Sequence, residues 1–174
     1  MVCFLWGWNS CFSQSILNQT REKVIAIAES YVGVRELTGN NDGEEVEMFL
    51  HSTGLSKGYA WCAAFASHVL IEAGVSAPIS AWSPDWFKTN VVYSKSKPTI
   101  EIFKSKPGQV FGLYFESKGR IAHVGIIIKE DRLHYITIEG NTDGSGGREG
   151  DGVYKKIRTK RSIYKISDYI KNGT

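Results

Sequence analysis

The chain has 174 residues, enough for one domain that buries most of the surface its unfolded form would expose. Hydrophobic residues make up 42% and charged residues 22%, and no run approaches the roughly 18 apolar residues of a spanning helix, which excludes disorder and stable membrane insertion. The formal net charge is only +3, and we interpret its basic cluster at residues 155–165 as a solvated strand face rather than a nucleic acid site.

Residues 1–17 form an N-terminal segment that differs from the rest of the chain. Its first fifteen residues, MVCFLWGWNSCFSQS, carry no charge, and Ser13 and Ser15 suit cleavage of a secretory signal. The basic start of a signal is missing and Gly7 and Asn9 interrupt the apolar run, so a disordered terminus fits equally well. A signal would favour the cell envelope or secretion, and delivery by a phage or a secretion system stays open.

Two helices are predicted before residue 55. Asn18 and Thr20 are candidate caps for the first helix, and Gly33 is a candidate stop. Between them the apolar residues recur at three- and four-residue spacing, at Val24, Ile25, Ala28, Tyr31 and Val32. A shorter helix follows around residues 46–50.

Cys62 opens a third predicted helix over residues 61–73, which has no charged residue before Glu72 and must therefore be largely buried. The first turn of a helix has unpaired N–H groups and the positive end of the helix dipole, and both favour a thiolate. Cys3 and Cys11 can form a disulfide, which would leave Cys62 as the free thiol. We interpret Cys62 as a nucleophile, against the alternative of a cysteine that serves as a small buried hydrophobe.

The second half of the chain is typical of an antiparallel sheet. A short helix over residues 85–90 lies among the aromatic residues Trp82, Trp86 and Phe87, which either line a groove or pack over the core. Runs rich in Val, Ile, Tyr and Phe then predict strands at 109–115, 120–129, 133–139, 153–158 and 162–166, with a short helix from Ser167. Helices followed by a strand meander indicate a single α+β domain over residues 18–174.

A thiol nucleophile needs a base and a group that orients the base, and the predicted strands contain candidates for both. His123 is the only ionisable side chain within residues 121–128, although a core histidine bound to a backbone carbonyl is the alternative. Strand alternation places Glu139 and Asn141 on one face, where either can accept a hydrogen bond from the imidazole. A solvated strand end and a turn residue are the alternatives for these two. His68 follows the cysteine by six residues and so lies on another helix face, which indicates a structural or rim histidine rather than a catalytic one.

Three blocks together resemble a known family. WCAAF at residues 61–65, IAHVG at 121–125 and EGNT at 139–142 are similar, in this order and spacing, to the signature blocks of CHAP domains. These are cysteine- and histidine-dependent amidohydrolases and peptidases of the NlpC-type superfamily, and the resemblance covers about residues 20–170. It implies a papain-like α+β fold in which N-terminal helices pack on an antiparallel sheet.

The resemblance also implies an activity and a set of roles. It implies hydrolysis of amide bonds in bacterial peptidoglycan, as an endopeptidase or an N-acetylmuramoyl-L-alanine amidase. Cys62 matches the nucleophile and His123 the base. Glu139 matches the acid that orients the base, and Asn141 a supporting polar group.

We expect no metal and no cofactor. Some CHAP domains bind calcium through acidic residues just before the cysteine, whereas residues 51–60 here contain neither Asp nor Glu. A zinc site built from Cys62, His123 and His68 is an alternative, but no Cys-x-x-Cys or paired histidine spacing supports it.

Tyr59, Trp61 and Trp82 are the candidates for substrate binding, because aromatic rings near the thiol can form the wall of a cleft. For Trp61, packing in the core is the safer interpretation. The expected partner is bacterial peptidoglycan, and we expect a monomer that binds no nucleic acid. Two other functions stay open. One is a non-catalytic wall-binding or effector module on the same fold, and the other is thiol-dependent acyl transfer or hydrolysis on another amide or ester.

Overall fold

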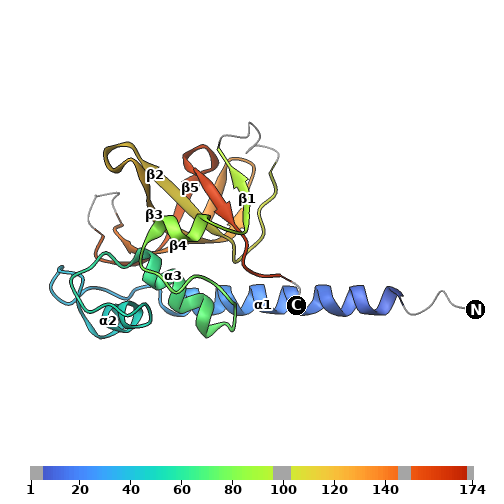
Figure 1. The fold of residues 1–174 in the computed structure, drawn as a ribbon, viewed down its shortest axis with the longest axis horizontal. Helices are drawn as coiled ribbons and strands as arrows, with labels where there is room; N and C mark the ends of the chain where they lie inside the picture. The colour runs from blue at the N-terminus through green and yellow to red at the C-terminus, as the bar shows by residue number, and fades with distance from the viewer. Residues whose placement is uncertain (1–5, 96–102, 145–149, 172–174) are drawn as a thin grey trace, which may run out of the picture.

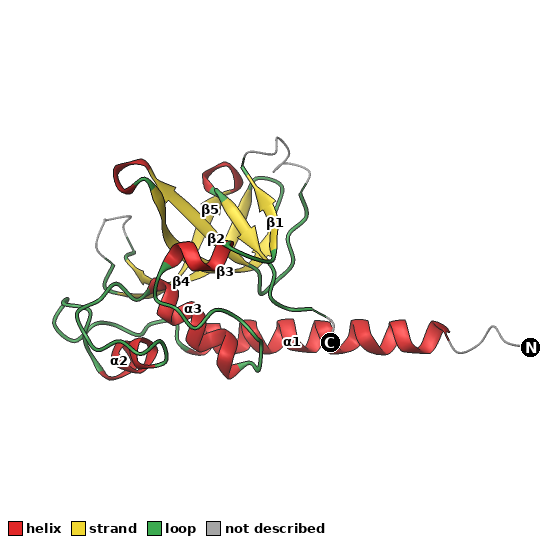
Figure 2. Cartoon of the chain, in the orientation of Figure 1, coloured by secondary structure: helices red, strands yellow, loops and turns green. Residues whose placement is uncertain are grey.

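The computed structural model of the chain describes residues 6–95, 103–144 and 150–171, with side chains from residue 13 onward. Within these residues three α-helices precede most of the sheet: α1 (Trp6–Ser30), α2 (Glu44–His51) and α3 (Cys62–Glu72). The helices lie together on one side of the strands (Figures 1 and 2). The predicted α+β class, with helices packed on an antiparallel sheet, is confirmed.

The sheet contains six strands in the order β1-β6-β2-β3-β4-β5, and every neighbouring pair is antiparallel. The strands are β1 (Val91–Ser94), β2 (Val110–Phe115), β3 (Arg120–Glu130), β4 (His134–Thr142), β5 (Gly152–Thr159) and β6 (Lys165–Ser167). Three short 3-10 helices are also described: η1 (Ser83–Phe87) lies between α3 and β1, η2 (Glu116–Lys118) joins β2 to β3, and η3 (Lys160–Ser162) joins β5 to β6.

The four long strands lie where the sequence predicts them, but the end of the chain differs from the prediction. The predicted helix from Ser167 is wrong, because Ser167 is the last residue of β6 and the residues up to 171 form no helix. The carboxylate of Asp168 is instead bound by Arg21 of α1 and by Gln109, the residue before β2, which fixes the backbone there in an irregular path. Strand β1 was not predicted, because it has only four residues and pairs with the equally short β6.

Helix α1 begins at Trp6, so the prediction of a start at Asn18 or Thr20 is wrong. Both supposed caps are satisfied within the helix: Asn18 Oδ1 accepts from Gln14 Nε2 at 3.0 Å, and the Thr20 hydroxyl donates to the Ile16 carbonyl at 3.0 Å. The helix thus continues across the predicted boundary between residues 17 and 18. Removal of a leader stays a prediction, and the supposed Cys3–Cys11 disulfide lies outside the described side chains.

Helix α3 is the central helix of the core and packs on β3 and β4. Gly140 of β4 permits this close packing, because a Cβ there would lie 2.7 Å from the Trp61 ring and 2.8 Å from Phe65. His68, also on α3, lies against the rings of Tyr31, the residue after α1, and Phe49 of α2, and its Nε2 is 3.0 Å from the Tyr31 hydroxyl. His68 is therefore a structural residue of the helix layer, as predicted.

Apolar side chains are buried on both faces of the sheet. One cluster joins the helices to β3 and β4, through residues such as Val124, Ile126 and Ile138. The other face carries a second cluster of Tyr93, Phe111, Ile127, Tyr135, Ile163 and Ile166. No described helix is both long and apolar enough to span a membrane.

A buried ion pair fastens α1 to the end of the chain. Arg21 Nη2 lies 2.8 Å from the Asp168 carboxylate, and Arg21 Nη1 donates to the Pro107 carbonyl at 2.8 Å. Gln109 donates to the same carboxylate at 2.9 Å. These contacts join the first helix, the start of β2 and the segment after β6.

Replacing Arg21 with Met should lower the free energy of unfolding by about 3 kcal/mol, because the buried Asp168 carboxylate would lose its charged partner. Urea denaturation followed by circular dichroism measures the change. Lys23→Met is the matched control, since Lys23 lies exposed on the same helix and its loss should change stability by less than about 0.5 kcal/mol. Equal effects of the two substitutions would contradict the anchoring role of the ion pair.

Candidate active site

Cys62 is the first residue of α3, and the backbone before it is held in place. No side chain caps this end of the helix, so its first N–H groups keep the partial positive charge of a helix start. The backbone N–H of Trp61 donates to Asn141 Oδ1 at 3.2 Å, which ties the residue before the cysteine to the end of β4. The thiol therefore has a fixed position at the junction of α3 and the sheet.

The thiol of Cys62 is 4% exposed and is surrounded by groups that stabilise its ionised form. Ser83 Oγ of η1 lies 3.6 Å from Sγ, and His123 and the backbone N–H of Val124 are the other groups that lower the pKa of the thiol. Burial alone would raise the pKa of the thiol. The hydrogen bond and positive charge of His123, with the smaller contributions of Val124 and Ser83, outweigh burial and lower the pKa to about 7.

His123, on β3, connects the thiol to a carboxylate. Its Nε2 lies 2.7 Å from Glu139 Oε2, which leaves Nδ1 as the ring nitrogen for Cys62. Burial lowers the pKa of the imidazole, but the hydrogen bonds and negative charges of Cys62 and Glu139 outweigh burial and raise the pKa to about 9. The predicted partnership of His123 with Glu139 is thus present in the structure.

Glu139 is fully buried on β4 and accepts hydrogen bonds on both carboxylate oxygens. Thr137 donates to Oε1 at 2.6 Å, and Arg158 of β5 donates to Oε1 at 2.8 Å and to Oε2 at 2.5 Å. Burial raises the pKa of the carboxyl, yet Arg158 and His123 outweigh burial and lower the pKa to about 2. Gly125 provides the space, because a Cβ there would lie 2.6 Å from Glu139 Cγ.

These pKa values define the charge state of the site. Between about pH 7 and pH 9, Cys62 is a thiolate and His123 an imidazolium, with Glu139 ionised beyond it. A thiolate next to a proton donor that is held by a third group is the arrangement that nucleophilic catalysis by cysteine requires. The geometry is suited to attack on a carbonyl carbon.

Asn141 does not contact His123, so it is not the group that orients the imidazole. The pairing of β4 with β5 shifts register between Glu139 and Thr142, and Asn141 has a φ of 51°, which breaks the strand alternation that predicted one shared face. Its amide instead donates to Asn41 Oδ1 at 3.1 Å and to the Gly150 carbonyl at 3.2 Å, while its oxygen holds Trp61. Asn141 supports the site from the side of the cysteine.

The three aromatic residues predicted to bind substrate differ in exposure. Trp61 is fully buried, stacks on Phe49 and donates from Nε1 to Glu36 at 2.8 Å, so the alternative of core packing holds for this residue and it forms no cleft wall. Tyr59 is 55% exposed and Trp82 is 51% exposed. The guanidinium of Arg120 lies 3.9 Å from the centre of the Trp82 ring, next to Ser83. Tyr59 and Trp82 stay predictions.

Sequence reasoning missed three residues of the site: Ser83, Thr137 and Arg158. Arg158 was interpreted as part of a solvated basic face. Alternation along β5 places Arg158 on the opposite face from the exposed residues of the strand. Tyr154, Lys156 and Arg158 are half-buried, while the residues between them are exposed. No comparable signal marks Ser83, which lies in a 3-10 turn that reaches the thiol only through the fold.

The zinc alternative is not supported by the geometry. His68 Nε2 is engaged by Tyr31 and lies 3.4 Å from Glu72, within the helix layer. Across the part of the chain that the structure describes, no three side chains of His, Cys, Asp or Glu gather as a metal site would need.

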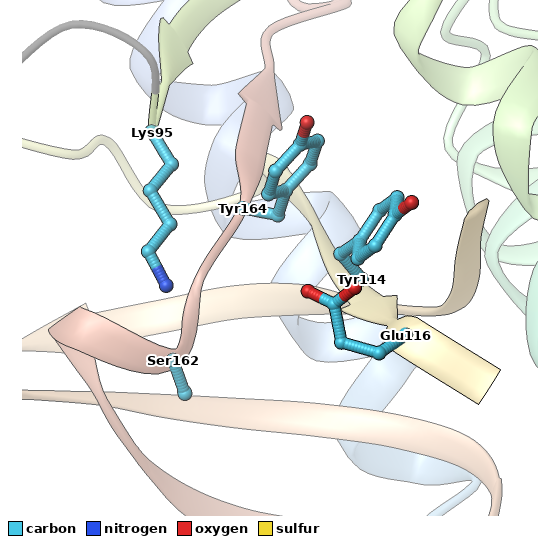
Figure 3. A pocket seen from close by; sticks show the side chains of 5 residues that line it. All are labelled: Lys95, Tyr114, Glu116, Ser162 and Tyr164. Carbon is cyan, nitrogen blue, oxygen red and sulfur yellow. The ribbon is translucent and has the colours of Figure 1, made fainter. Parts of the chain in front are cut away.

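A pocket of about 380 Å³ lies elsewhere on the sheet and is lined by Lys95, Tyr114, Glu116, Ser162 and Tyr164 (Figure 3). The rings of Tyr114 and Tyr164 lie beside each other, with centres 4.8 Å apart. Tyr114 follows Leu113, which pairs with His123 across β2 and β3. Neither Cys62 nor His123 nor Glu139 lines the pocket, so the reactive groups and this pocket are separate features.

No family model and no curated protein matches the chain. Among solved structures, an NlpC/P60 family protein from Bacillus cereus ATCC 10987 is similar, with a TM-score of 0.52 and 14% sequence identity. The likeness covers 87% of this chain but only 40% of that protein, so the present chain spans less than half of its length. At this identity the comparison shows the fold, which is the papain-like α+β fold of that neighbour.

Alkylation of Cys62 by iodoacetamide should follow its thiolate, with a midpoint near pH 7. Replacing His123 with Ala should move the midpoint to higher pH, because the substitution removes the hydrogen bond and positive charge that lower the pKa of the thiol. Peptide mapping by mass spectrometry measures the labelling rate of Cys62 against pH. His51→Ala, at an exposed histidine of α2, is the control. A wild-type midpoint near the ordinary cysteine value of about 8.5 would contradict the activated thiol.

Proposed function

We propose that the chain is a cysteine-dependent hydrolase of the CHAP type, which cleaves amide bonds in the peptide part of bacterial peptidoglycan. One observation carries this proposal: Cys62 opens α3 beside His123, which lowers the pKa of the thiol to about 7 and lies 2.7 Å from the buried carboxylate of Glu139. The resemblance of the three sequence blocks to CHAP domains supports the substrate class. The fold of the NlpC/P60 neighbour is compatible with it.

In the first half of the proposed reaction, the Cys62 thiolate adds to the carbonyl carbon of the scissile amide. Negative charge develops on the carbonyl oxygen, and free N–H groups in the first turn of α3 are suited to stabilise it. The tetrahedral intermediate then breaks its C–N bond, and the departing amine takes a proton from the His123 imidazolium. An enzyme thioester and a free amine result.

In the second half, His123 is neutral and accepts a proton from a water molecule. The hydroxide so formed adds to the thioester carbonyl, and collapse of the second tetrahedral intermediate expels the Cys62 thiolate. The product is a carboxylic acid, which loses its proton to solvent to become a carboxylate, and His123 has regained its proton from the water molecule. Glu139 keeps one orientation of the imidazole throughout and stabilises its charged form.

The lowered pKa of the thiol favours an enzyme over a non-catalytic module on the same fold, because a module that only binds has no need of an ionised, hydrogen-bonded cysteine.

Hydrolysis should require the thiolate and the imidazolium together. We therefore expect its rate to be greatest between about pH 7 and pH 9. It falls below this range as Cys62 gains a proton, and above it as His123 loses the proton that the leaving amine needs.

Cys62→Ala and Cys62→Ser should each reduce the hydrolysis of purified peptidoglycan by at least about a thousand-fold, because the nucleophile is lost while the fold is kept. New amino groups in the digest give the rate, and mass spectrometry of the fragments separates endopeptidase from N-acetylmuramoyl-L-alanine amidase activity. Ser67→Ala, on the same helix but bound to the loop at Ser80, is the control for folding. Turnover retained in either cysteine variant would contradict the thiol mechanism. Wild-type protein that alkylates normally but releases no amine would point to another amide or ester substrate.

Trp82→Ala should raise the KM for peptidoglycan fragments several-fold with little change in kcat, if its exposed ring contacts the substrate beside the thiol. Ile79→Ala is a matched control, because Ile79 is 66% exposed in the same loop and lies outside the site. Steady-state kinetics on soluble muropeptides give both constants. Similar KM values for the two variants would remove Trp82 from the substrate-binding surface.

A further inference from the structure

Arg158 contacts the carboxylate that holds the catalytic imidazole. Its guanidinium binds Glu139 at both ends, with Nε 2.8 Å from Oε1 and Nη2 2.5 Å from Oε2. His123 Nε2 binds the same Oε2 at 2.7 Å. The imidazole and the guanidinium therefore share one oxygen atom, and the two cations lie on either side of a single buried negative charge.

The setting of Arg158 differs from that of a solvated arginine. Its side chain is 24% exposed although it lies on β5, the edge strand of the sheet, and it faces the interior with Tyr154 and Lys156. A bidentate pair with a carboxylate fixes the plane of the carboxylate as well as its charge. Three donor groups from two residues, Thr137 of the same strand and Arg158 of β5, decide how Glu139 presents Oε2 to His123.

We propose that Arg158 is a positioning residue of the site, which fixes Glu139 toward His123 and, by sharing its carboxylate oxygen, limits the proton affinity of the imidazole. This inference rests on the proposed function of Cys62, His123 and Glu139. It adds Arg158 to these three residues as a fourth charged group. The charges then alternate in sign from Cys62 through His123 and Glu139 to Arg158, so that the buried array has no net charge between about pH 7 and pH 9.

The sign of the effect follows from the charges that surround the imidazole. Cys62 from α3 and Glu139 from β4 favour the imidazolium. Arg158 from β5 carries a like charge on the shared carboxylate and so must oppose it, while Asp143 after β4 favours the charged form of Arg158. Removing Arg158 leaves the Glu139 charge to act on His123 without opposition. The pKa of His123 should therefore rise, and the release of its proton to a leaving amine should become harder.

The test is an NMR titration of the His123 imidazole, assigned by its disappearance in His123→Asn. In Arg158→Met the midpoint should move upward by about one pH unit or more relative to wild type, as expected for a lost charge within a few ångströms. Arg132→Met is the matched control, because Arg132 is exposed in the turn between β3 and β4 and its loss should leave the midpoint unchanged. A midpoint in Arg158→Met that stays at the wild-type value, or moves downward, overturns the proposal.

Two further variants guard against misfolding and separate charge from shape. Arg158→Gln keeps one N–H donor toward Glu139 and removes the charge, so the same upward shift is expected even if the methionine variant fails to fold. Arg158→Lys keeps the charge without the planar fork, so its midpoint should lie within about half a unit of wild type. A lysine variant that shifts as far as the neutral variants would overturn the role of the charge.

The titration is independent of any hydrolysis assay. An upward shift in a protein that does not cleave peptidoglycan would leave the positioning role standing and count against the proposed substrate. Normal cleavage by the wild-type protein, with no shift of the His123 midpoint in the Arg158 variants, would overturn the positioning role and leave the proposed substrate standing. The two proposals therefore fail on different measurements.

Discussion

The structure around the reactive thiol depends on one buried negative charge, the carboxylate of Glu139. An ionised carboxylate is very costly to remove from water unless it is paired and hydrogen-bonded. Here His123, Thr137 and Arg158 together supply four short hydrogen bonds, and no surface of the residue reaches solvent. Three neighbouring strands are thereby fixed around one side chain. The orientation of the imidazole toward Cys62 is a direct result of how this charge is compensated.

The end of β4 serves both sides of the site because the strand changes its geometry after Glu139. Glu139 lies on the face opposite the helices, Gly140 packs against α3, and Asn141 turns toward the loop before Cys62. The amide of Asn141 holds the backbone of Trp61, whose indole is bound in turn by Glu36. One short segment therefore positions the base through its carboxylate and the nucleophile through its amide. A regular strand would have aimed Glu139 and Asn141 in the same direction.

Much of this site could be predicted from sequence, and the exceptions have physical causes. Cys62 and His123 were identifiable because each is a chemically distinctive residue in a strongly patterned, apolar element. The choice between Glu139 and Asn141 as the group that orients His123 could not be made from sequence, because alternation fails at a bulge that no local pattern indicates. Arg158 was overlooked because a charged residue is ordinarily exposed. Its partner, the buried Glu139, lies on the neighbouring strand β4, and sequence alone does not show that β4 pairs with β5. The start of α1 was misplaced because Asn18 and Thr20 bond within a helix as readily as they cap one.

The dependence of the thiol on long-range partners makes its reactivity a property of the folded chain. In the unfolded protein Cys62 has no imidazolium or oriented backbone N–H beside it, and its pKa is that of an ordinary cysteine, about 8.5. Its activating groups belong to β3 and η1, far along the chain, so the thiol becomes strongly nucleophilic only when helix and sheet have come together. During synthesis or transport in an unfolded form, the same residue is correspondingly less prone to oxidation and to reaction with its surroundings.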